Sequence, residues 1–106
     1  QSMTVIKLQE RMEIRPPFLL DVRRANEEAI CSIPGTDLRV EHTQILQYLD
    51  SIPKDRDIVV YCRSGIRSMS AIAALATNGW ELEQLWNLDG GIHAWSREID
   101  PSMPRY

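Results

Sequence analysis

Two short runs of mostly apolar residues constrain the fold more than any other feature of this sequence: FLLDV at 18–22 and DIVVY at 57–61. Neither run alternates apolar with polar residues, which is typical of strands buried on both faces. Segments with a helical spacing of apolar residues lie between and after the two runs. Strands that alternate with helices predict an α/β fold, a parallel sheet flanked by helices on both faces. A length of 106 residues predicts a single domain.

Shorter patterns predict the remaining elements. Helical spacing predicts four helices, over 5–12, 42–49, 69–78 and 92–99. Thr4 is expected to cap the first of them and Ser68 the third. Short apolar runs predict strands over 38–40 and 85–88, and the polar stretch 23–31 is expected to contain one helical turn.

Composition argues against several classes of protein. The net charge of −3 argues against nucleic acid or an anionic membrane as the main partner, because both need a basic surface. No apolar run approaches the roughly 18 residues of a membrane span. Two cysteines, Cys31 and Cys62, are too few for a disulfide framework or a cysteine-rich zinc site, so no metal is expected. Lone thiols in an acidic chain predict a reducing compartment, the cytoplasm.

The first residues are polar, and no apolar segment of a signal peptide follows them. Residues 1–3, QSM, resemble the remnant of a cleaved expression tag. The domain is therefore expected to comprise residues 4–106.

Cys62 follows directly on the strand DIVVY and precedes a helix, so it is expected at the carboxyl edge of the sheet, where ligands of such sheets bind. A thiol loses its proton more readily at a helix N-terminus and beside arginine. Backbone amides of the loop are expected to form an anion-binding nest around the sulfur, and Gly65 permits the required turn. The loop residues that line this candidate site are Arg63, Ser64, Gly65, Ile66, Arg67 and Ser68.

Three segments of the chain resemble the rhodanese (sulfurtransferase) family. CRSGIRS resembles the active-site loop of the family, LLDVRRANEEAICSIPG its early Asp-Val-Arg segment, and WNLDGGIHAW its closing Asn-Leu-x-Gly-Gly segment. The three segments stand in the family's order, and the resemblance covers residues 4–98. It departs from the family at Cys31-Ser32, where Gly-His is usual.

The resemblance implies a sulfurtransferase with a rhodanese-like sheet. Cys62 would be the nucleophile that carries the transferred sulfur as a persulfide, cradled by the amides of residues 63–68. Arg67, with Arg63, would hold a small anionic donor such as thiosulfate, and no metal or organic cofactor is implied. Asp21 and Arg23, which match the Asp-Val-Arg motif, are interpreted as positioning residues beside the loop.

Cys31 and the tail EIDPSMPRY resemble rhodanese domains at the C-terminus of adenylyltransferase/sulfurtransferases of the molybdopterin or thiamine type. Such a context would make a cysteine desulfurase the donor and a ubiquitin-like sulfur carrier protein the acceptor. One alternative is a non-catalytic rhodanese-like interaction module, although such modules usually lack the cysteine. Another is a phosphatase or arsenate reductase, but four residues separate Cys62 from Arg67 and phosphatase loops have five.

Several other residues are interpreted as structural. The three tryptophans and Cys31 are expected to pack in or around the core, and the two histidines to lie on the surface. The acidic pair Glu27-Glu28 is interpreted as part of a solvated face.

Overall fold

A sheet of five parallel strands forms the centre of the protein. The computed structural model describes all 106 residues. Its strands are β1 (Ser2–Met3), β2 (Phe18–Asp21), β3 (Leu38–Arg39), β4 (Ile58–Tyr61) and β5 (Leu85–Leu88). They are arranged in the order β1-β5-β4-β2-β3, and every neighbouring pair is parallel. The predicted α/β fold is confirmed, with β4 as the central strand.

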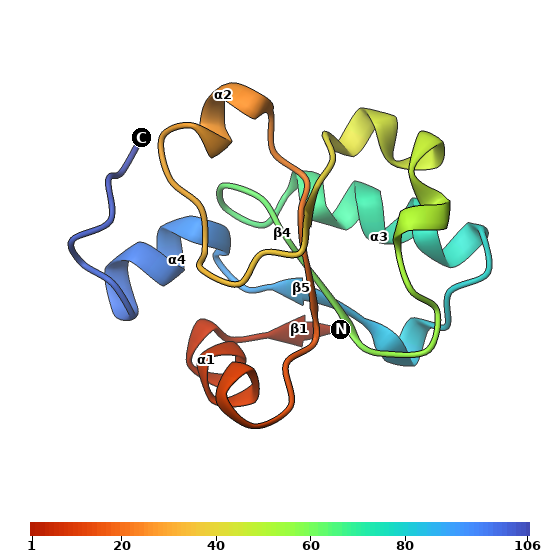
Figure 1. The fold of residues 1–106 in the computed structure, drawn as a ribbon, viewed down its shortest axis with the longest axis horizontal. Helices are drawn as coiled ribbons and strands as arrows, with labels where there is room; N and C mark the ends of the chain where they lie inside the picture. Colours follow the sequence, from red (N-terminus) through yellow and green to blue (C-terminus); the bar gives the residue numbers. More distant parts are fainter.

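Helices cover both faces of this sheet. The α-helices are α1 (Val5–Ile14), α2 (Ala25–Glu28), α3 (Arg67–Thr77) and α4 (Gly91–Glu98). Short 3-10 segments span His42–Gln47, Leu49–Ser51 and Leu82–Gln84. In Figure 1, α1 and α4 lie on one side of the sheet, and α3 with the 3-10 segments between β3 and β4 lies on the other. No helix is both long enough and apolar enough to span a bilayer.

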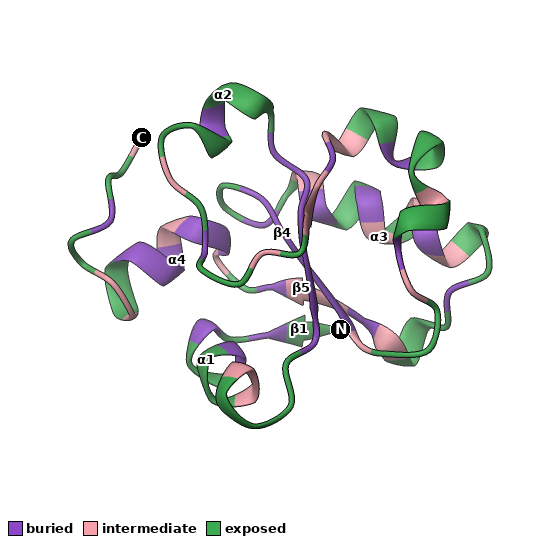
Figure 2. Ribbon diagram, viewed as in Figure 1, coloured by how far each residue is buried: buried purple, intermediate pink, exposed green.

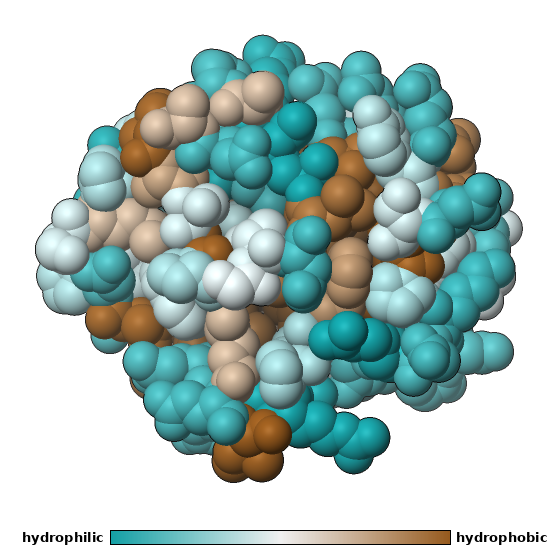
Figure 3. All heavy atoms as spheres, viewed as in Figure 1, coloured by the Kyte–Doolittle hydropathy of each residue, from teal (hydrophilic) through white to brown (hydrophobic).

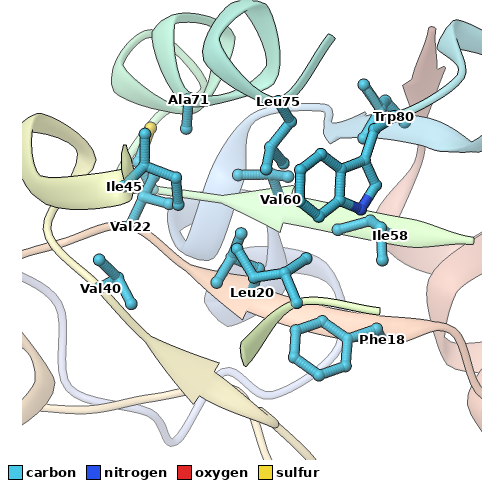
Figure 4. Packing of buried hydrophobic residues seen from close by; sticks show 13 residues of the cluster. Phe18, Leu20, Val22, Val40, Ile45, Ile58, Val60, Ala71, Leu75 and Trp80 are labelled. Atoms are coloured by element: carbon cyan, nitrogen blue, oxygen red, sulfur yellow. The ribbon is translucent and has the colours of Figure 1, made fainter. Parts of the chain in front are cut away.

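Two hydrophobic clusters fill the spaces between the sheet and its helices. Every residue of β2 and β4 is buried, as their unbroken apolar runs predicted, and Figure 2 shows the burial following the strands. On the α3 side, Ala71 and Leu75 are spaced four apart and both point toward β4, where Val60 meets them (Figure 4). On the surface seen in Figure 3, hydrophobic side chains form small separate groups among hydrophilic ones.

The structure corrects three expectations from the sequence. Residues 1–3 were left out of the fold, but Ser2–Met3 pair with β5 as strand β1, and Met3 is 4% exposed. The helix expected over 42–49 consists of two 3-10 segments interrupted at Tyr48. Ser68 does not cap α3: the helix begins at Arg67 after Ile66, and Ser68 turns inward and is fully buried.

Candidate active site

Cys62 lies where the central strand ends, at the carboxyl edge of the sheet. Asp21 ends the neighbouring strand β2, and Asn87 lies in β5 on the other side of β4. The segment from Cys62 to Ile66 joins β4 to α3, and we call it the cysteine loop. Cys62, Asp21 and Asn87 lie at one edge of the sheet because the carboxyl ends of its parallel strands meet there.

The cysteine loop curls around the sulfur atom of Cys62. The Gly65 amide donates to Cys62 Sγ at 3.1 Å, and the Ser68 hydroxyl lies 3.5 Å from the same atom. Gly65 has a φ of +107°, a left-handed conformation that glycine adopts without strain. Cys62 is 1% exposed, so the surrounding residues enclose its side chain almost completely.

The hydrogen bonds of the loop favour the thiolate form of Cys62. Burial raises the pKa of this thiol, because it disfavours the charged form. The Ser68 hydroxyl and the backbone amides of Ser68, Gly65 and Ser64 act in the opposite direction and together hold the pKa below its ordinary value. The Gly65 amide and the Ser68 hydroxyl therefore lie beside the sulfur, and donors of this kind can hold negative charge there.

The start of helix α4 holds the loop from outside. The Ile92 amide donates to the carbonyl of Cys62 at 2.9 Å, and the His93 amide donates to the carbonyl of Arg63 at 3.1 Å. Gly91 makes this contact possible, since a Cβ at this position would stand only 2.5 Å from the Cys62 carbonyl oxygen. With their carbonyls bound on the outer side, the loop peptides can direct amides toward the sulfur.

Asn87 provides a second outer contact. Its Nδ2 donates to the Gly65 carbonyl at 3.1 Å, and its Oδ1 accepts the Ser68 hydroxyl at 2.5 Å. Because that hydroxyl has a single proton, it accepts from the Cys62 thiol in this arrangement, and it donates to a Cys62 thiolate only by turning from Asn87. One amide side chain thus fixes both Gly65 and Ser68, the two residues closest to Cys62 Sγ. Neither Asn87 nor Gly91 was predicted from the sequence as a site residue, although both belong to the segment WNLDGGIHAW.

Asp21 and Arg23 form an ion pair that is completely buried. Arg23 donates to both carboxylate oxygens of Asp21, at 2.9 and 2.7 Å, and also to the carbonyls of Glu27 and Cys31. Burial opposes the charge of Arg23, but the hydrogen bonds to Asp21 and to the Tyr106 hydroxyl, with the charge of Asp21, outweigh it and raise its pKa. The pair therefore shapes the segment that follows β2. Neither side chain makes a hydrogen bond to the cysteine loop.

Glu27 does not belong to a solvated face, which corrects the interpretation of the Glu27-Glu28 pair. Arg67 donates to both of its carboxylate oxygens, at 2.6 and 2.8 Å, and Glu27 is 9% exposed. The Arg67 hydrogen bonds lower the pKa of Glu27 to about 2, against the effect of burial. Glu28, by contrast, is exposed and pairs with Arg39 at 3.1 Å.

The side chain of Arg63 turns away from the sulfur toward the tail. Its Nε donates to the Tyr106 carbonyl at 2.8 Å, Nη2 binds the same oxygen, and the guanidinium lies 5.1 Å from the centre of the Tyr106 ring. His93 also receives a hydrogen bond from Arg63 Nε, at 3.1 Å. The tail has no periodicity in sequence, so nothing in the pattern predicted that Tyr106 would reach the loop.

The loop residues proposed from the sequence thus form two groups, those with donors near the Cys62 sulfur and those whose side chains bind elsewhere. Ser64, Gly65 and Ser68 direct donors at Cys62, while the side chains of Arg63 and Arg67 bind other parts of the protein. Ile66 is 75% exposed and has no contact role in the nest.

No group of three or more His, Cys, Asp and Glu side chains is arranged to hold a metal ion. A surface hollow of about 890 Å³ lies at the opposite edge of the sheet from Cys62. Its lining is polar and charged and includes Arg15, Lys54, Arg56 and Glu83.

A match to one protein family shows how this chain is related to known proteins. The sequence model described as "Rhodanese-like domain" matches residues 4–98. The chain belongs to the rhodanese-like family. The rhodanese-like domain protein of Staphylococcus aureus shares its fold, with a TM-score of 0.82 and 29% identity over 100% of this chain and 98% of the other.

Relatives by sequence support sulfur transfer as the class of activity. A protein named sulfurtransferase from Allochromatium vinosum is 44% identical over 80 residues, which cover 76% of this chain and 72% of the relative. The adenylyltransferase and sulfurtransferase MOCS3 of Drosophila grimshawi is 36% identical over the whole chain. This chain spans a quarter of that larger protein.

We predict that Ser68→Ala in this rhodanese-like domain raises the pKa of Cys62, because the thiolate loses the hydroxyl group that lies beside its sulfur and can donate to it. The measurement is the pH dependence of thiolate absorbance or of alkylation by iodoacetamide. Ser70→Ala is the matched control, since Ser70 is exposed on the same helix. An equal midpoint for the two variants would contradict the assigned contact.

We predict that Gly91→Ala lowers the free energy of unfolding by about 3 kcal/mol, because Gly91 has a φ of +59° and its Cβ would press on loop backbone. Gly79→Ala is the control. Its φ of +108° is also left-handed, but its nearest neighbour is the flexible end of Lys54, so a loss of about 1 kcal/mol is expected. Urea unfolding measures both, and similar losses would argue against a special contact at Gly91.

Proposed function

We propose that Cys62 takes a sulfane sulfur from a donor, carries it as a persulfide and passes it to a nucleophilic acceptor. The observation that carries this proposal is that the Gly65 amide and the Ser68 hydroxyl both lie within hydrogen-bond distance of Cys62 Sγ, at 3.1 and 3.5 Å. The thiolate is the reactive form of cysteine, and these donors favour it despite burial. The same donors suit the negative charge of a persulfide at this position.

The reaction balances without an added oxidant or reductant. The Cys62 thiolate attacks the outer sulfur of thiosulfate, an S–S bond forms on Cys62, and the bond within thiosulfate breaks so that sulfite leaves with the electron pair. The acceptor then attacks the terminal sulfur of the persulfide and the Cys62 thiolate is regenerated. Two covalent steps of this kind need no cofactor and give ping-pong kinetics.

The name of one relative supports a proposal about the physiological partners. The name of the MOCS3 relative joins adenylyltransferase and sulfurtransferase activities in one protein. We propose that this chain serves such a protein as its C-terminal sulfurtransferase domain, with a cysteine desulfurase persulfide as donor and a ubiquitin-like sulfur carrier protein as acceptor. Two unpaired cysteines fit a reducing compartment, which we take to be the cytoplasm.

Replacement of the two cysteines tests the proposal. We expect Cys62→Ser to abolish sulfur transfer from thiosulfate to cyanide, because no thiolate remains to attack the donor. Cys31→Ser should retain most of the activity, since the reaction uses no atom of the Cys31 side chain. The measurement is the rate of thiocyanate formation, and an equal loss in both variants would overturn the assignment of Cys62.

The 1% exposure of Cys62 also fits a second candidate, a non-catalytic interaction module in which the thiol is inert. Intact-mass measurement after incubation with thiosulfate separates the two. A gain of one sulfur atom that is absent in Cys62→Ser supports the sulfurtransferase. An unchanged mass supports the interaction module.

A further inference from the structure

The positive charge of Arg67 is neutralised inside the protein. Its two terminal nitrogens, Nη1 and Nη2, each donate to a different oxygen of Glu27, and this two-bond geometry is the strongest that arginine forms with a carboxylate. The Arg67 side chain is 26% exposed and that of Glu27 11%, so water screens the pair only in part. Arg67 is nevertheless close enough to Cys62 for a thiolate there to contribute to raising its pKa, after the larger effect of the Glu27 hydrogen bonds.

Glu27 is held in this position by the backbone around it. Its Oε1 also accepts the Arg24 amide at 3.1 Å, at the start of α2, and its own carbonyl accepts a bond from Arg23 at 3.3 Å. Swinging the carboxylate away would leave the first turn of α2 without this partner. With a pKa of about 2, Glu27 is charged at any pH at which sulfur transfer is measured.

The charges near the cysteine loop therefore cancel in pairs. Asp21 neutralises Arg23, and Glu27 neutralises Arg67. Arg63 pairs with no Asp or Glu, but two of its nitrogens are bound to the Tyr106 carbonyl. The backbone nest therefore has no free guanidinium beside it, and this arrangement suits a single negative charge better than two.

We propose that Glu27 determines donor specificity: by neutralising Arg67, it makes the site select sulfane-sulfur donors with at most one negative charge over the dianion thiosulfate. The persulfide group of a thiol, R–S–SH, is a donor class with this property, since the group itself carries at most one negative charge. This inference rests on the proposed function and narrows the donor of the same reaction.

The step with such a donor is balanced. The Cys62 thiolate attacks the terminal sulfur of R–S–SH, the new S–S bond forms on Cys62, and the donor S–S bond breaks. The electron pair leaves on R–S⁻, and the proton stays with the transferred sulfur until solvent removes it. No second charge has to be bound, in contrast to thiosulfate.

A pair of donors that differ by one charge tests the proposal. Methanethiosulfonate is a monoanion in which a methyl group replaces one oxygen of thiosulfate, so both donors deliver an outer sulfur and release a sulfur oxyanion. With cyanide as acceptor, we compare kcat/KM for the two, each divided by the rate of that donor with a free thiol. We expect the wild-type domain to prefer methanethiosulfonate.

Glu27→Gln should raise kcat/KM for thiosulfate on the order of tenfold relative to methanethiosulfonate, because one nearby negative charge is removed. Glu28→Gln is the matched control: it changes the net charge equally, but at an exposed residue paired with Arg39. An unchanged ratio in Glu27→Gln, or the same change in Glu28→Gln, overturns the role of Glu27.

Three further outcomes distinguish a failure of this inference from a failure of the proposed function. If thermal unfolding shows that Glu27→Gln does not fold, the test is the donor preference of the wild-type domain. Equal normalised kcat/KM values for the two donors, or a higher value for thiosulfate, would then overturn the inference. If both donors transfer sulfur through Cys62 without the expected preference, only the role of Glu27 fails. If neither donor loads Cys62, the proposed function fails and this inference fails with it.

Discussion

The arrangement of the cysteine loop depends on where its carbonyl groups find partners. A peptide presents its N–H and its C=O on opposite sides, so a loop can direct amides inward only if its carbonyls are satisfied outside. The amides of Ile92 and His93 and the side chain of Asn87 supply those outer partners. The surroundings of Cys62 are therefore built from two separate parts of the chain, since the loop follows β4 and its outer partners lie in β5 and α4.

Two ion pairs stand beside this loop, one fully buried and one partly exposed, and they act differently. The Asp21–Arg23 pair is inaccessible to solvent and binds backbone carbonyls, so it shapes the segment after β2. Removing one member of such a pair is costly, because the other charge is left buried and unpaired. The Glu27–Arg67 pair instead crosses from that segment to α3 and alters the charge that a donor meets. The first pair thus positions the second.

Local pattern predicted the sheet but only part of the site. The runs 18–22 and 57–61 predicted buried parallel strands, and CRSGIRS predicted a loop with hydrogen-bond donors. These predictions were possible because the strands and the loop are each formed by residues that are contiguous in sequence. The strand at Ser2–Met3 was missed because two residues carry no periodicity and only pairing with β5 makes them a strand. The prediction for Glu27 was wrong because two adjacent acidic residues usually face solvent, and the sequence did not show that Arg67, 40 residues away, binds this carboxylate.

The sequence by itself determined the α/β class, the place of Cys62 directly after the strand at 57–61 and a run of residues able to surround its sulfur with donors. These features depend on neighbours along the chain. Only the tertiary structure decided which groups face the sulfur: Ser68 turned inward, Arg63 turned toward Tyr106, and Arg67 became bound to Glu27. The physical reason is that hydrogen-bond partners and charge neutralisation come from residues distant in sequence, which meet only when parallel strands bring their carboxyl ends to one edge.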